Sequence, residues 1–256
     1  MVRKIKTESY NFVKQNFGMN FKLSFWAILF WAILLFFFNV LLNTSVNNHS
    51  VLGESKVILY SGDLFSLGIS IVFAIIGYEY YKANQDKSHL NGSLCQGFTG
   101  DKVIKTLVLY LIISLFSVAL MFISIIFASL SIGFFVGIGM KAAIVPILLV
   151  TIGTFVGFFI YIIAIFSQAN FIMLASIDEG TFGELGYIGA IKKSKTVMTG
   201  HVSEYIVMNL SLIGWFLLVG ITAGLASVFV IPYYLNVRGN YYRYIMESHL
   251  DEPLSK

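Results

Sequence analysis

The chain has 256 residues, of which 57% are hydrophobic and only 12% are charged, and its mean hydropathy is +0.82. Because a soluble domain carries about 25% charged residues, this composition excludes an ordinary water-soluble protein. The net charge is +4, but the basic residues flank apolar runs, so anionic lipid headgroups are the expected partners and nucleic acid is not. Cys95 is the only cysteine in the chain, which excludes a disulfide framework and a cysteine-rich metal site.

The N-terminal segment, residues 1–20, is predicted to form an interfacial helix. Ile5, Val13 and Phe17 share one face of it, with lysines around them. The apolar run 21–42 that follows is longer than the roughly 7–15 apolar residues of a signal peptide. We therefore expect it to be retained as the first membrane span.

Three further runs are long enough to cross a bilayer, which takes about 20 apolar residues. They lie near 64–82, 106–132 and 143–175, and the second contains no charged residue. The third is longer than one crossing requires, so we expect it to tilt or to continue as a surface helix. Pro146 near its start suits a position in the first turn of a helix.

The last apolar run is either one long span or a hairpin that bends near Thr222-Ala223-Gly224. Basic residues stay on the cytoplasmic side during insertion, and basic-rich and basic-poor segments alternate along this chain. Six spans put 15 of the 17 Lys and Arg residues on one side, with Lys56 and Lys141 opposite, whereas five spans put only 12 there. We therefore predict an all-α, polytopic transmembrane helix bundle with six spans (five is the alternative) and both termini in the cytoplasm. The predicted parts are an interfacial helix at 1–20, a bundle at 21–246 with spans near 21–42, 64–82, 106–132, 143–175, 204–221 and 224–242, and a short polar tail at 247–256.

One segment between the spans has the pattern of an ordered helix. Thr181 and Glu184 have the spacing of a capping box, and the helix they open is expected to run through Met198 and to close at Gly200. Its acidic start and its later lysines match the helix dipole. A surface helix on the inner leaflet is the simplest interpretation. The alternative is a specific contact with lipid headgroups or a partner through Lys192, Lys193 and Lys195.

Few residues in the spans are suited to chemistry. No charge lies at the predicted middle of a span, which argues against a proton-coupled pump. Gln168, Asn170 and Asn209 are the polar residues nearest the membrane interior, where inter-helix hydrogen bonds are expected and substrate contact is the alternative. The histidines fall in separate segments, and nucleophile-elbow, Walker A and dinucleotide motifs are absent. The sequence therefore predicts no enzyme activity, no cofactor, and no catalytic or metal-binding residues. Hairpin and packing roles are assigned to Gly214, Trp215, Gly220, Gly224 and Pro232.

The C-terminal half contains a series of short motifs in a fixed order. These are A-I-K-K-S-K-T-V-M-T-G at 190–200, L-S-L-I-G-W at 210–215, I-T-A-G at 221–224, I-P-Y-Y at 231–234 and Y-Y-R at 241–243. The series resembles a family of Firmicutes integral membrane proteins catalogued only as a domain of unknown function, number nine-seven-five. Residues 77–98 fit the middle segment of that family. At 145–147 the chain reads V-P-I, where the family pattern usually has I-P-G.

The resemblance implies a T-x-G hairpin, hence six spans, and the plasma membrane of a Gram-positive bacterium, but it implies no catalytic residues. We predict a non-enzymatic plasma-membrane protein that acts through protein partners or lipids. A transporter accessory, an envelope-homeostasis factor and an immunity protein against membrane-active peptides are the forms considered. The expected partners are a bilayer with anionic inner-leaflet lipids and another membrane protein. The alternative is a small-solute or lipid transporter, because glycines and prolines in the spans allow broken helices.

Overall fold

The structure is a computed structural model that describes residues 1–18, 33, 54–85, 97–137, 144–222 and 224–250. Within those residues every regular element is an α-helix, as the sequence predicts. The predicted first span at 21–42 lies outside the described residues except for Ile33. The helices are α1 (Val2–Gln15), α3 (Glu54–Gln85), α4 (Gly100–Gly137), α5 (Ile144–Phe166), α6 (Ala169–Asp178), α7 (Phe182–Met198), α8 (Val202–Ile221) and α9 (Ser227–Leu250).

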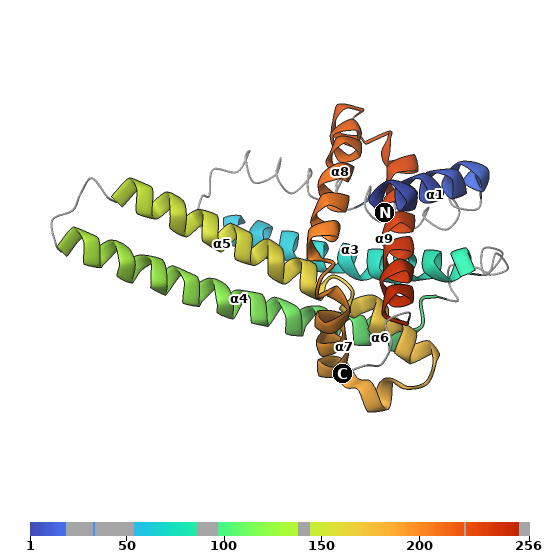
Figure 1. The fold of residues 1–256 in the computed structure, drawn as a ribbon, viewed down its shortest axis with the longest axis horizontal. Helices are drawn as coiled ribbons and strands as arrows, with labels where there is room; N and C mark the ends of the chain where they lie inside the picture. Colours follow the sequence, from blue (N-terminus) through green and yellow to red (C-terminus); the bar gives the residue numbers. More distant parts are fainter. Residues whose placement is uncertain (19–32, 34–53, 86–96, 138–143, 223, 251–256) are drawn as a thin grey trace.

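The longest described helix, α4, forms with α5 an apolar hairpin that projects from the rest of the molecule. Figure 1 shows α4 and α5 side by side, with α8 and α9 running across their direction. Three described segments are long and apolar enough to cross a membrane, namely Gly100–Phe134, Ile152–Asp178 and Val202–Ile221. Large apolar side chains on the hairpin are exposed, including Leu115 at 77% and Val150 at 69%. Because water would disfavour so much apolar surface, this hairpin belongs in a lipid environment.

The centre of the molecule is the crossing of α3 and α9. A Cβ atom on Gly239 would lie 3.0 Å from the backbone nitrogen of Tyr81 and 3.2 Å from the carbonyl oxygen of Gly77. The two helices therefore approach backbone to backbone, as small residues allow. Beside this contact the Tyr242 ring packs edge-on against Tyr81 and stacks on Phe171, at centroid distances of 4.9 and 5.2 Å.

A buried amide network fastens α1 to α9. The side-chain amide of Asn240 donates to Ser9 Oγ at 2.8 Å and to Asn236 Oδ1 at 2.9 Å, and Asn84 Nδ2 donates to Asn240 Oδ1 at 3.1 Å. The N-terminal helix is thus docked on the protein through a buried face of Ile5, Ser9 and Val13. Phe17, predicted to share this face, lies beyond the last residue of α1. The helix ends at Gln15, and Phe17 is 43% exposed.

The helix expected after Thr181 forms with nearly the expected bounds. It is α7, it ends at Met198, and Gly200 follows with a φ of 90°. The capping-box bond is absent, because the Thr181 hydroxyl donates to the Ser176 carbonyl at 3.4 Å. Gly186 interrupts the helix with a φ of 61°. A left-handed residue of this kind favours glycine and explains the kink.

A tight turn joins α8 to α9 at the position where the sequence predicts a hairpin. Gly224 has a φ of 92°, and its amide donates to the Val219 carbonyl at 2.8 Å. The Thr222 hydroxyl accepts from the Ala226 amide at 3.0 Å. The carbonyl end of α8 and the start of α9 are thereby hydrogen-bonded within the turn, as an apolar surrounding requires.

Candidate functional site

A compact ion-pair cluster joins the ends of α3, α4 and α6. Asp178 accepts from Lys102 at 2.6 Å and from Lys82 at 2.9 Å, and Lys82 also pairs with Glu79 at 2.9 Å. Both lysine ammonium groups lie over the Tyr78 ring, at 5.2 and 5.8 Å from its centroid. With two acids and two bases the cluster is neutral and leaves no charge for a ligand. We interpret it as a structural contact that holds the ends of three helices together.

The predicted span at 143–175 is broken near its C-terminal end. α5 ends at Phe166 and α6 begins at Ala169, while Pro146 occupies the first turn of α5 as expected. Side chains from two other helices donate hydrogen bonds to backbone carbonyls at the break. Ser194 of α7 donates to the Ile165 carbonyl at 2.6 Å, and Arg238 of α9 donates to the Ser167 carbonyl at 3.3 Å. A non-helical step in an apolar segment is tolerated where protein groups satisfy it in this way.

Arg238 brings a partly buried positive charge to the break. Its guanidinium lies 5.6 Å from the Phe171 ring and 5.9 Å from the Tyr234 ring. Among the described residues it forms no ion pair with a carboxylate, and its Nε is buried without a hydrogen-bond partner. A cation held by aromatic faces and carbonyls, rather than by an acid, leaves a positive field at the break.

Two of the three predicted intramembrane polar residues meet at this break. Gln168 and Asn170 are 2% and 4% exposed, and one amide oxygen of each has no hydrogen-bond partner in the described structure. The Tyr110 hydroxyl, which lies near Asn170, donates to the Ser70 carbonyl at 3.2 Å. Asn209 is not part of the cluster. Its amide donates to the Tyr205 carbonyl at 2.8 Å, one turn back in the same helix.

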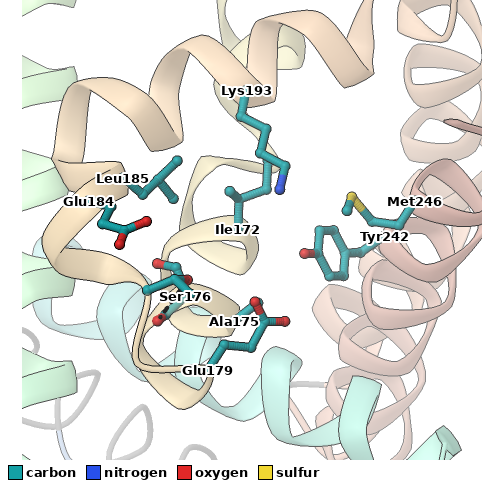
Figure 2. Close-up of a pocket in the computed structure, with 10 residues that line it drawn as sticks. Ile172, Ala175, Ser176, Glu179, Glu184, Leu185, Lys193, Tyr242 and Met246 are labelled. Atoms are coloured by element: carbon teal, nitrogen blue, oxygen red, sulfur yellow. Dashed lines mark hydrogen bonds between the residues drawn. The ribbon is translucent and has the colours of Figure 1, made fainter. Parts of the chain in front are cut away.

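The three lysines proposed as a contact surface lie on α7. Lys192, Lys193 and Lys195 are exposed, while Ser194 between them is fully buried at the α5–α6 break. Lys193 also lines a cavity of about 320 Å³, and Figure 2 shows its side chain reaching from α7 toward Tyr242, with Glu179 below them. The cavity is lined by Ile172, Ala175, Ser176, Glu179, Thr181, Glu184, Leu185, Lys193, Tyr242 and Met246.

The hairpin residues separate into two groups. Gly224 forms the turn, Pro232 is buried in α9, and Trp215 packs on Tyr233 with ring centroids 5.3 Å apart. The packing role of Gly214 and Gly220 stays a prediction, because no described residue packs against either position. A Cβ at either position would meet nothing within 4 Å, because both lie on the exposed side of α8.

Three features of the structure were not predicted from the sequence. Arg238 lies inside the predicted span 224–242, but basic residues were expected only beside the apolar runs, so its contact with the break was not predicted. Ser194 stands between lysines, and its signal in the sequence is its helical spacing from the buried Ala190 and Met198. The structure also brings His201 and His249 together, with ring centroids 6.0 Å apart, and His201 Nδ1 lies 2.8 Å from Glu204 Oε2.

A family model described as a protein of unknown function (DUF975) matches residues 22–249 of the chain. The match covers the described helices from α3 to α9. No curated protein and no solved structure matches the chain.

Proposed function

The chain belongs to this family of unknown function, and we propose that it is a non-enzymatic plasma-membrane protein that acts through protein partners or lipids. In this proposal it has six membrane-embedded helices, with both termini in the cytoplasm of a Gram-positive bacterium. It serves as an accessory to a transporter, in envelope homeostasis, or in immunity to membrane-active peptides.

Contacts among the four basic-rich segments support the common side of the termini. Lys102 and Lys82 both pair with Asp178, and Arg243 in the last helix pairs with Glu8 in the first at 3.6 Å. His249 Nε2 lies 3.0 Å from the Val197 carbonyl oxygen, which links the C-terminal end to α7. Segments that touch lie on the same side of a bilayer, and their basic residues favour the cytoplasmic side.

The observation that carries the proposal is an ordered charged end attached to an exposed apolar hairpin. α7 is fastened through Ser194 and still exposes Lys192 and Lys195, so these cations are held in place and free to contact a partner or anionic headgroups. The α4–α5 hairpin exposes large apolar side chains along its length, as a surface for lipid tails or partner helices requires.

The test is purification in native-lipid nanodiscs followed by mass spectrometry of everything that comes with the protein. A stoichiometric protein partner supports the accessory form, and Lys192→Gln with Lys195→Gln should weaken its retention. Lys14→Gln, at an exposed lysine of α1, is the matched control. A monomer without partner or lipid that shows intrinsic flux contradicts the proposal. A separate experiment tests the side of the C-terminus. In a Cys95→Ser background, the Glu247→Cys variant should react with a membrane-impermeant thiol reagent only from the cytoplasmic side.

The break between α5 and α6 favours one second candidate, a small-solute or lipid transporter. Broken helices that bring a charged side chain to a non-helical step are typical of transporter binding sites, and here Arg238 reaches the step. The probes are chloride and small carboxylates in proteoliposome flux assays, because Arg238 leaves a positive field there. Flux that is abolished by Asn170→Ala and retained in Asn209→Ala supports transport, since only Asn170 belongs to the cluster. Absence of flux for every probe leaves the accessory proposal standing.

A further inference from the structure

A groove of about 480 Å³ lies between α1 and the α8–α9 hairpin, and its lining is basic and aromatic. Figure 1 shows α1 lying beside α9 near the middle of the hairpin. The groove contains two cations and no carboxylate. Its lining residues are Val2, Arg3, Lys6, Thr7, Tyr10, Trp215 and Tyr233.

The two cations are oriented by contacts that leave them available to an anion. Lys6 Nζ donates to the Ser211 carbonyl at 3.4 Å, which uses one of its three donors. Arg3 is exposed and makes no ion pair among the described residues. The nearest acid on the same helix, Glu8, pairs with Arg243 at 3.6 Å and with Lys4 at 3.9 Å and does not line the groove. The groove therefore selects a negatively charged group, and an arginine with a lysine suits a phosphate.

Aromatic rings form the other wall of the groove. Trp215 and Tyr233 have centroids 5.3 Å apart, and Tyr10 meets Tyr233 edge-on at 6.4 Å. Tryptophan and tyrosine are enriched where hydrocarbon meets the headgroups of a bilayer. A phosphate with an attached glycerol and acyl chains would contact both walls, whereas a free phosphate would contact only the cations.

The position of the groove along α8 agrees with the depth of the lipid headgroups in a bilayer. Ser211 lies ten residues before Ile221 at the end of α8, which is about 15 Å of helix and half of a roughly 30 Å hydrocarbon core. No charged residue occurs from 205 to 237. Ile221 and Leu225 at the tip are 83% and 80% exposed. With Arg3 and Lys6 at headgroup level, this apolar tip reaches the middle of the bilayer and returns to the same side, so α8 and α9 would form a re-entrant hairpin in place of the two crossing spans predicted near 204–221 and 224–242.

We propose that the groove binds the phosphate of an anionic phospholipid in the leaflet that faces the N-terminus, while the α8–α9 tip is embedded in the hydrocarbon of that leaflet. This site is separate from the α7 lysines. It rests on the proposed function in so far as it needs the protein in a membrane, and it names the lipid class and the residues that recognise it.

The test is native mass spectrometry of protein released from nanodiscs that contain phosphatidylglycerol and phosphatidylcholine together. Wild type is expected to retain phosphatidylglycerol selectively. The Arg3→Gln, Lys6→Gln double variant should lower that retention about tenfold or more, as loss of charge-assisted hydrogen bonds predicts. Lys14→Gln removes a positive charge from the same helix outside the groove and should change retention by less than about twofold. Thermal unfolding in phosphatidylcholine nanodiscs should be the same for all three proteins, which excludes misfolding as the cause.

Each contrary result overturns the site in a recognisable way. Equal loss in Lys14→Gln shows attraction by overall charge, and full retention in the double variant shows a lipid bound elsewhere. Displacement of the lipid by millimolar inorganic phosphate shows that the occupant is a soluble phosphate. If wild type retains no phosphatidylglycerol but carries a protein partner, the groove fails and the proposed function stands. If neither lipid nor partner is retained, the proposed function fails as well.

Discussion

Replacing Asp178 by Asn should loosen the junction of three helices. The change removes the acceptor of two charge-assisted hydrogen bonds, at 2.6 Å from Lys102 and 2.9 Å from Lys82. Breaking a buried ion pair costs about 3–5 kcal/mol. Lys102 is 7% exposed, but the Asp178 side chain is 30% exposed, so water screens part of the interaction. We therefore expect the free energy of unfolding to fall by about 2–3 kcal/mol, since Glu79 alone remains to pair both lysines.

The assay is thermal unfolding in detergent, followed by intrinsic fluorescence. At about 2–4 °C per kcal/mol for a chain of this size, the Tm should fall by about 5–10 °C. The control is Asp101→Asn, because Asp101 pairs with Lys105 at 2.7 Å on an exposed helix surface and is 58% exposed. Exposed pairs contribute about 0–1 kcal/mol. Equal Tm values for the two variants would refute the argument that burial makes the Asp178 cluster important.

Two further substitutions test the packing of the interior. Gly239→Ala should lower the free energy of unfolding by about 1–3 kcal/mol, because the new methyl would meet the Gly77 carbonyl at 3.2 Å. Gly214→Ala, with no atom within 4 Å of its Cβ, should be neutral or stabilising, and thermal unfolding of both variants decides. Ser194→Ala should cost about 1–2 kcal/mol, since the Ile165 carbonyl loses its 2.6 Å hydrogen bond. An unchanged Tm in Ser194→Ala would mean that the break does not need this hydroxyl.

The local helices of this chain could largely be predicted from its sequence. The end of α7 at Met198 and the turn after Ile221 follow from glycines whose positive φ ends a helix, and such signals act over a few residues. The break after Phe166 could not be predicted in this way. The run 143–175 is uniformly apolar, and the groups that stabilise its interruption come from residues 194 and 238, far along the chain. Likewise, helical spacing places Ser194 on the buried face of α7, but it does not show that the hydroxyl binds the Ile165 carbonyl.

Composition and the lengths of the apolar runs by themselves indicated helices that are long and apolar enough to cross a membrane, because bilayer insertion depends on hydropathy summed over about 20 residues. The family follows from the order of short motifs. Only the tertiary structure decided which polar residues act together. Arg238 and Asn170 come to the same break although 68 positions separate them, while Asn209 turns back on its own helix. The groove beneath α1 arises in the same way, since Arg3 and Lys6 acquire an aromatic wall from Trp215 and Tyr233. Hydrogen bonds and ring contacts act over a few ångströms in space, and the linear order of residues does not specify those distances until the helices are packed.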